Sequence, residues 1–208
     1  MLLHARIGAH LPESRTVTLQ SEIKSCRLCE ERFLATHIAH QPRPVVWFQP
    51  GARILIAGQA PGARVHASGK PFTDPSGDRL RDWMGLGEEI FYDRKQIAIV
   101  PMAFCFPGYN QKGADLPPPA ICANTWRPQV MDQLTSVRLT LLVGGYAQKW
   151  HLGQGSVTQT VANWRDHAPA VFPLPHPSWR NTAWLKKNPW FEAELQPALQ
   201  VAVKEALL

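Results

Sequence analysis

The chain has no long hydrophobic run, and this absence narrows what it can be. Its 208 residues are 45% hydrophobic, yet no window reaches the roughly 18 consecutive apolar residues that cross a membrane. The N-terminal stretch also lacks the apolar core of a secretory signal, since His4, Arg6, His10 and Pro12 interrupt it. We therefore expect a soluble, cytoplasmic protein with no membrane partner.

Internal repeats and low-complexity linkers are also absent from the sequence. A chain of this length can bury one substantial core but is short for two full domains. We therefore expect a single domain over residues 1–208, and a monomer.

Acidic residues are the scarcer charge. The 16 Asp and Glu residues face 22 Lys and Arg residues, for a formal net charge of +6, and the sequence pI is about 9.4. A basic surplus favours a polyanionic partner such as nucleic acid, although a merely soluble basic protein would show the same balance.

Short apolar segments rich in β-branched residues alternate with segments that have helical patterning. This alternation predicts an α/β fold of three layers, with a central four-stranded, mostly parallel sheet between helices. The predicted strands are 54–57, 97–102, 139–143 and 171–174. The predicted helices are 78–84, 125–134, 146–152 and 190–208, the last divided near Pro197.

Cysteine occurs only four times, as Cys26, Cys29, Cys105 and Cys122. In a reducing compartment, grouped cysteines are more often ligands than disulfides. Cys26 and Cys29 form a close pair, whereas Cys105 and Cys122 bracket a Pro- and Gly-rich segment that lacks helical or strand patterning. The spacing is compatible with an iron-sulfur cluster, with zinc, or with unrelated buried cysteines.

Residues 58–80, GQAPGARVHASGKPFTDPSGDRL, follow the first predicted strand. They match neither the Walker phosphate loop nor the dinucleotide fingerprint. Gly58 and Gly62 would let backbone N–H groups approach a planar polar ligand, and the ring of Phe72 could stack on it. Ser76, ahead of the predicted helix, could hold a phosphate. His66 is the only imidazole here, and it could equally be an exposed histidine without a function.

The last predicted strand runs into a second polar segment, PHPSWRN. Two prolines make a rigid turn around His176, and Ser178, Trp179 and Arg180 follow. A hydroxyl, an indole and a guanidinium on one turn suit contacts to a nucleic-acid backbone and insertion into a base stack.

GQAPG at 58–62, SGKPF at 68–72, HPS at 176–178 and the four cysteines in this order resemble the uracil-DNA glycosylase superfamily, in particular its iron-sulfur family 4 branch and bacterial relatives. The resemblance implies a structural [4Fe-4S] cluster on the four cysteines, bound by residues 21–35 and 105–122, with zinc as the alternative occupant. It also implies hydrolysis of the bond between uracil and deoxyribose, in single- or double-stranded DNA, by a nucleoid-associated enzyme of base excision repair.

The resemblance further assigns roles to residues. Phe72 would stack on the base, with Gly58 and Ala60 lining its pocket. Asn110 and Gln59 are the nearest amides that could read the edge of the base, in place of the family's usual Asn. His176 would donate to the leaving uracil. Ser178 would contact a phosphate, and Trp179 and Arg180 would fill the gap left by the flipped base. Gln59 or His66 could position the attacking water.

The chain departs from the superfamily's usual motifs at two positions. Ala60 stands where the best-known first motif carries Asp, and Pro101 occupies the strand end where an Asn commonly reads uracil. Two alternatives therefore stand beside a monofunctional uracil glycosylase. One is a protein that binds uracil-DNA or abasic DNA with little turnover, and the other is a glycosylase for hypoxanthine or xanthine.

Overall fold

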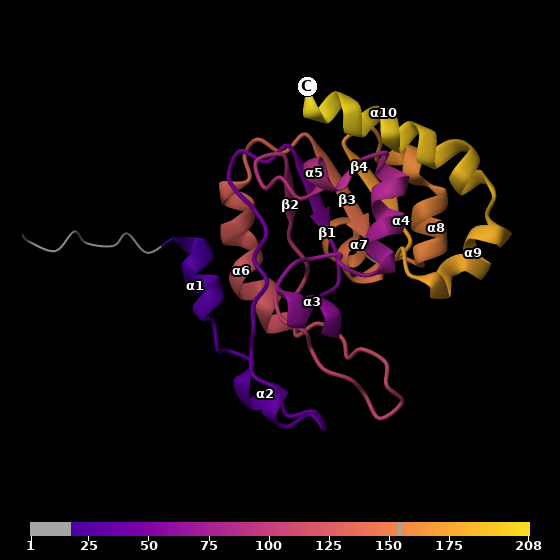
Figure 1. Ribbon diagram of the computed structural model, residues 1–208. Coiled ribbons are helices and arrows are strands. Elements are labelled where there is room, and N and C mark those ends of the chain that lie inside the picture. The colour runs from indigo at the N-terminus through magenta and orange to yellow at the C-terminus, as the bar shows by residue number, and fades with distance from the viewer. Residues whose placement is uncertain (1–17, 154) are drawn as a thin grey trace, which may run out of the picture.

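The computed structural model describes residues 18–153 and 155–208. A four-stranded sheet with strand order β2-β1-β3-β4 forms its centre (Figure 1). Every strand pairing is parallel, which confirms the predicted three-layer α/β/α fold. The strands are β1 (Ile54–Ala57), β2 (Ile97–Ile99), β3 (Leu139–Val143) and β4 (Val171–Leu174).

Helices lie before, between and after the strands in sequence. The α-helices are α1 (Leu19–Ser25), α2 (Glu30–Leu34), α3 (Ala63–Ser68), α4 (Pro75–Met84), α5 (Glu88–Phe91), α6 (Ala120–Gln133), α7 (Gly145–Leu152), α8 (Val157–Ala162), α9 (Thr182–Lys187) and α10 (Gln196–Leu207). Two 3₁₀ turns, η1 (Trp164–Asp166) and η2 (Trp179–Asn181), and one π-helical segment, η3 (Phe191–Leu195), complete the set. None of the helices in the described ranges is both long and apolar enough to traverse a lipid bilayer.

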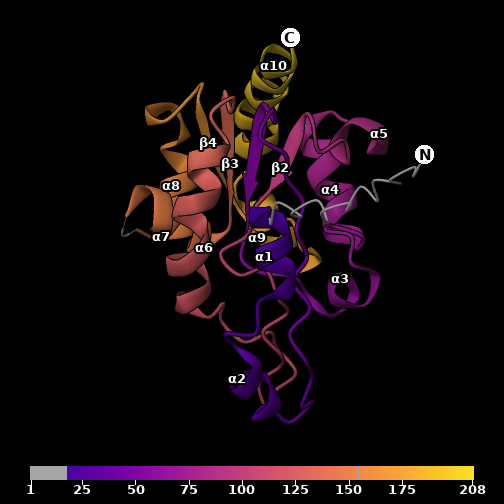
Figure 2. The same cartoon turned by 90° about the vertical axis from the view of Figure 1, so that its left-hand side faces the viewer.

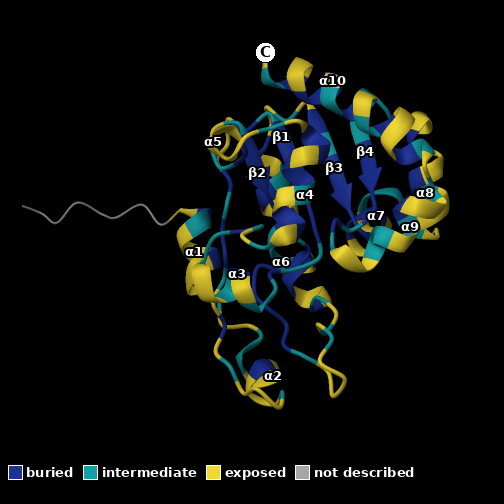
Figure 3. Ribbon diagram, turned by 45° about the vertical axis from the view of Figure 1, so that its right-hand side comes forward, coloured by how far each residue is buried: buried dark blue, intermediate teal, exposed yellow. Residues whose placement is uncertain are grey.

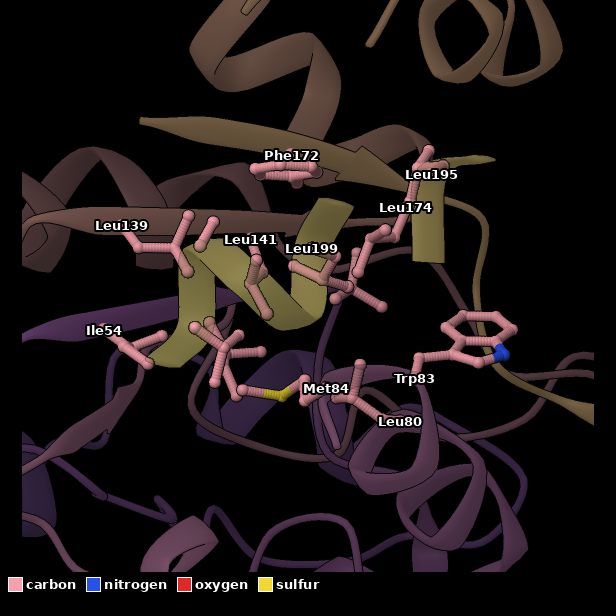
Figure 4. Close-up of a cluster of buried hydrophobic side chains, with 14 of the residues drawn as sticks. Ile54, Leu80, Trp83, Met84, Leu139, Leu141, Phe172, Leu174, Leu195 and Leu199 are labelled. Atoms are coloured by element: carbon pink, nitrogen blue, oxygen red, sulfur yellow. The ribbon is translucent and has the colours of Figure 1, made fainter. Parts of the chain in front are cut away.

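The alternating side chains of the strands bury two hydrophobic layers. Ile54 packs in the same cluster as Leu80 of α4 and Leu199 of α10 (Figure 4). Leu55, one residue on, points to the other face and clusters with Val130 of α6. Figure 2 shows the result, with α4 and α5 on one side of the sheet and α6 and α7 on the other.

All four strands end at the same edge of the sheet because they are parallel. Beyond that edge, α2 and the segment that precedes α6 extend away from the body of the molecule (Figure 1). The strands are buried, whereas α2 and this segment carry many exposed residues (Figure 3). Loops that follow the carboxyl ends of parallel strands are the usual place for a ligand in such folds.

Several boundaries differ from the sequence prediction. Residues 63–68, expected within a loop, form α3, and α4 begins at Pro75 because the Asp74 side chain caps it by accepting from the Gly77 N–H. α6 begins at Ala120, so Cys122 lies in a helix rather than at the end of the irregular segment. The C-terminal helix is divided as predicted, with Pro197 in the first turn of α10.

Candidate active site

A pocket of about 110 Å³ lies at the carboxyl end of the sheet. Its lining includes the segment 58–62, Phe72, Asp74, Ser76, Asp115 and His176. The pocket therefore brings together the loop after β1, the start of α4, the turn after β4 and the segment between Cys105 and Cys122. Of the predicted site residues, Gly58, Gln59, Ala60, Phe72, Ser76 and His176 all line it.

His176 follows β4 and is held in one orientation. The backbone N–H of Ser178 donates to its Nδ1 at 3.2 Å, and the Asn181 side chain donates to its carbonyl oxygen at 2.7 Å. Because a backbone N–H can only donate, Nδ1 must be an acceptor, and the proton of the neutral ring is on Nε2. Burial lowers the pKa of His176, although Asp74 opposes this. The ring is thus a neutral hydrogen-bond donor that lines the pocket.

Phe72 forms one wall of the pocket in an unusual backbone conformation. Its φ of 53° is in the left-handed region, which costs a residue with a side chain roughly 1 kcal/mol or more. The Phe72 carbonyl accepts from the Tyr92 hydroxyl at 2.8 Å and from Arg81 at 3.5 Å. Gly77 passes so close that a Cβ there would lie 1.9 Å from the same oxygen. These contacts hold the Phe72 backbone in place.

The first turn of α4 contributes Asp74 and Ser76. Asp74 Oδ1 accepts from the Ser76 hydroxyl at 2.5 Å and from the Gly77 N–H at 3.3 Å. Oδ1 of this carboxylate therefore caps the helix, and the buried Ser76 hydroxyl already donates to it.

Asp115 was not identified as a site residue from the sequence. It lies in the segment between Cys105 and Cys122, far from the glycine-rich loop in sequence, and is exposed at the pocket. Partial burial raises the pKa of Asp115, Arg180 opposes this, and Asp74 adds to it. One signal was available in the sequence, since Asp115 is the only acidic residue between these cysteines.

Two predicted residues lie away from the pocket. The His66 ring on α3 packs 5.4 Å from the His40 ring and 5.9 Å from Phe106, measured between centroids, and burial lowers its pKa. The Asn110 side chain is exposed and accepts from the N–H groups of Lys112 at 2.9 Å and Ala114 at 3.0 Å. Asn110 thus stabilises its own turn, and the structure does not bring it to the pocket.

The turn after His176 presents its side chains outward. Trp179 is 74% exposed, and the Arg180 guanidinium lies 6.0 Å from its ring centroid. Arg79 of α4 donates to the Ser178 carbonyl at 3.0 Å and so fixes the turn against the body of the protein. Ser178, Trp179 and Arg180 lie beside the pocket lining rather than in it.

The four cysteines line one small hollow between α1, α2, the segment after β2 and the start of α6. All four are free thiols. Burial, and then the neighbouring Cys122, raises the pKa of Cys105 to about 12, and burial raises that of Cys122 to about 11. Within the described ranges, no three His, Cys, Asp or Glu side chains are arranged to hold a single metal ion.

The sequence was also compared with models of known protein families. The model described as the uracil DNA glycosylase superfamily matches residues 45–200, a range that contains all four strands and every residue lining the pocket. Cys26 and Cys29 precede it. Since this match covers most of the chain, the protein belongs to the uracil DNA glycosylase superfamily, whose members are DNA glycosylases.

Proposed function

We propose that this protein hydrolyses the N-glycosidic bond between uracil and deoxyribose in DNA, as the first step of base excision repair. The observation that carries the proposal is the neutral His176 ring, whose Nδ1 accepts from the Ser178 N–H so that Nε2 keeps a proton for the pocket. As the bond breaks, negative charge develops on the base. A fixed donor at that point stabilises the charge more than it stabilises the bound substrate.

Recognition of the base would combine stacking and polar contacts. A glycosylase must rotate its target nucleotide out of the duplex and enclose the base. The Phe72 ring offers an aromatic face at the pocket, which the 58–60 segment also lines. The Gly58 and Gln59 carbonyls of this segment already accept from the Met102 and Ala103 N–H groups. Gln59 is a side chain at the pocket that can both donate and accept, so it is the strongest candidate to read the edge of the base.

The DNA itself would meet the turn at 178–181. Trp179 has the exposure expected of a side chain that inserts into a base stack, and Arg180 has the charge expected of a phosphate contact. The net charge of +6 favours the same partner. Among the described residues no lysine lines the pocket, which supports attack by water over a Schiff base and hence base removal without strand cleavage.

The four cysteines are proposed to hold a [4Fe-4S] cluster. The donor set fits, because four free thiols share one hollow with apolar neighbours such as Phe33 and Trp126. The cluster's contribution would be structural, as a cross-link between the N-terminal helices and the segment before α6.

The cluster proposal has a direct analytical test. Anaerobically purified protein should show broad brown absorbance and contain iron and acid-labile sulfide in equal amounts. Colourless protein containing one equivalent of zinc would refute it.

A second candidate, tight binding of uracil-DNA or abasic DNA with little turnover, is favoured by one observation. Ala60 lines the pocket where the superfamily's best-known motif has a carboxylate. Such a protein would release at most one base per molecule and retain the product, whereas an enzyme would continue for many cycles when substrate is in excess.

The proposed reaction is tested with oligonucleotides that carry one uracil, as single strands and as duplexes, followed by alkali to cut any abasic site. We expect alkali-dependent cleavage at the uracil position and no cleavage before alkali. Matched oligonucleotides with hypoxanthine or xanthine define base preference. Faster release of either base than of uracil would favour a glycosylase for hypoxanthine or xanthine. Intact strands throughout would overturn the proposal.

A further inference from the structure

The pocket needs a group that can act on water, and the glycine-rich loop does not supply an acidic one. Ala60 carries only a methyl group, and the sole imidazole of the loop, His66, packs against His40 and Phe106 instead of lining the pocket. Gln59 lines the pocket, but an amide cannot take up a proton near neutral pH. Any carboxylate at this site must therefore come from another part of the chain.

Two carboxylates line the pocket, and they differ in their existing contacts. Asp74 accepts at Oδ1 from both Ser76 and Gly77 as the cap of α4. Within the described residues, no hydrogen-bond donor contacts the Asp115 carboxylate. Its Oδ2 lies 4.0 Å from the position that a Cβ on Gly62 would occupy. Asp115 therefore extends over the end of the GQAPG segment with its oxygens available.

The backbone around Asp115 is ordered by short-range contacts. Tyr109 and Asp115 form an antiparallel bridge. The Asn110 N–H donates to the Ala114 carbonyl at 2.8 Å, and the Leu116 N–H donates to the Gly108 carbonyl at 2.8 Å. These bonds order the turn itself, so the carboxylate is presented by a defined turn.

The charges around Asp115 suit a base that works at the mouth of the pocket. The charges of Arg180 and Asp74 both act on Asp115 and oppose each other, and His176 is neutral. Since Asp115 is exposed in the free protein, water reaches it directly. DNA held by Arg180, whose charge acts on Asp115, would lie near this carboxylate.

We propose that Asp115 is the catalytic carboxylate that positions and deprotonates the attacking water, an assignment that rests on the proposed glycosylase function. The bond from C1′ to the base nitrogen breaks, and its electron pair leaves with the base while His176 donates a hydrogen bond to it. The water oxygen then bonds to C1′, and one water proton passes to Asp115 and later to solvent. Before attack, the negative carboxylate also stabilises the cationic sugar.

The test compares wild type with Asp115→Ala in base release from a single-stranded uracil oligonucleotide, with enzyme in excess. We expect release to slow by about 100-fold or more, the usual range for loss of a general base. Added formate, a small carboxylate that can enter the vacated space, should restore part of the rate. Asp132→Ala on the exposed surface of α6 is the matched control and should match wild type with and without formate.

Measuring DNA affinity separates a catalytic role of Asp115 from a role in positioning the DNA. Affinity for an oligonucleotide with 2′-fluoro-deoxyuridine, whose fluorine disfavours the cationic sugar and blocks cleavage, should be unchanged in Asp115→Ala. A variant that releases uracil at the wild-type rate, or that loses binding and rate in parallel, would overturn the role of Asp115 while leaving the glycosylase function intact. Wild-type protein that releases no base would overturn the glycosylase function, and the role of Asp115 with it.

Discussion

Arg127 holds the end of β2 from inside the protein. Its side chain is fully buried and donates to the carbonyl oxygens of Val100 at 2.6 Å and Pro101 at 3.3 Å. Nη2 of the same guanidinium lies 2.7 Å from Nε2 of His151. Because arginine can only donate, His151 must accept, and it is therefore neutral. The pocket residue Pro101 is thus tied to α6 and α7.

This contact predicts a pH dependence of stability. Burial, together with Arg127, lowers the pKa of His151 to about 4, whereas an unfolded histidine titrates near 6.5. Between these two pKa values, His151 is protonated in the unfolded state and neutral in the folded state. The free energy of unfolding should therefore fall as pH drops from about 6.5 to about 4, by a few kcal/mol at most. Urea unfolding at several pH values measures it.

The variant His151→Gln keeps an acceptor for Arg127 but does not titrate, so its stability should fall less on acidification. His37→Gln, at an exposed position, is the control and should follow wild type. Equal acid sensitivity of His151→Gln and wild type would contradict the buried neutral histidine.

Single residues could be predicted from the sequence where local motifs mark them. His176 and Phe72 stand in short recognisable segments, and both line the pocket. Asp115 could not be assigned, because its place depends on how the segment between two distant cysteines folds back on the first loop. The burial of Arg127 could not be predicted either, since a charged residue within a helix ordinarily predicts an exposed position.

Among the elements, the start of α4 determines the shape of the pocket. Its capping residue Asp74 lies at the pocket, and Gly77 lets the helix approach the Phe72 carbonyl. Phe72 keeps its positive φ because this carbonyl is held by Tyr92 and Arg81. The helix, the strained residue and the stacking wall therefore form one packed unit.

Replacing Gly77 with Ala tests this packing. The added Cβ would lie 1.9 Å from the Phe72 oxygen and 2.7 Å from its carbonyl carbon, both backbone atoms. We expect the free energy of unfolding to fall by about 1–3 kcal/mol, as for other overpacked sites, and base release to fall with it. Gly51→Ala, where nothing lies within 4 Å of the added Cβ, should change neither. Unchanged stability in Gly77→Ala would refute the close contact.

The strands were predicted more reliably than the helix ends. All four apolar segments form strands, because buried parallel strands need near-continuous apolar sequence. β2 ends at Ile99, before the predicted end, and Pro101 just beyond it has no N–H for a ladder. α3 was missed because its short sequence, ARVHAS, stands between glycines that predict a loop.

At the scale of the whole molecule, the segment between Cys105 and Cys122 connects two sites. Its ends line the cysteine hollow, and Asp115 at its middle lines the pocket. Apart from one bridge it contains no strand, and no helix before Ala120. Its placement therefore depends on what holds its ends, and a cluster on the four cysteines would fix both.

Cys105→Ser should thus affect a pocket that the residue does not touch. We expect loss of the brown absorbance, a lower melting temperature and slower base release, because Asp115 would no longer be held over the first loop. Ser25→Ala, an exposed change beside Cys26, should retain colour and activity. A Cys105→Ser protein that keeps wild-type absorbance and activity would exclude the cysteine from cluster binding.

The most direct measurement is the rate at which wild type and His176→Ala, each in excess, release free uracil from a single-stranded oligonucleotide. The affinity of each protein for the 2′-fluoro analogue is measured in parallel. Wild type should release uracil, and the variant should be slower by about 100-fold or more while binding nearly as well, since the His176 bond strengthens only as the uracil anion forms. Wild-type protein that leaves the DNA intact, or a variant that releases uracil at the wild-type rate, would contradict His176-assisted uracil excision.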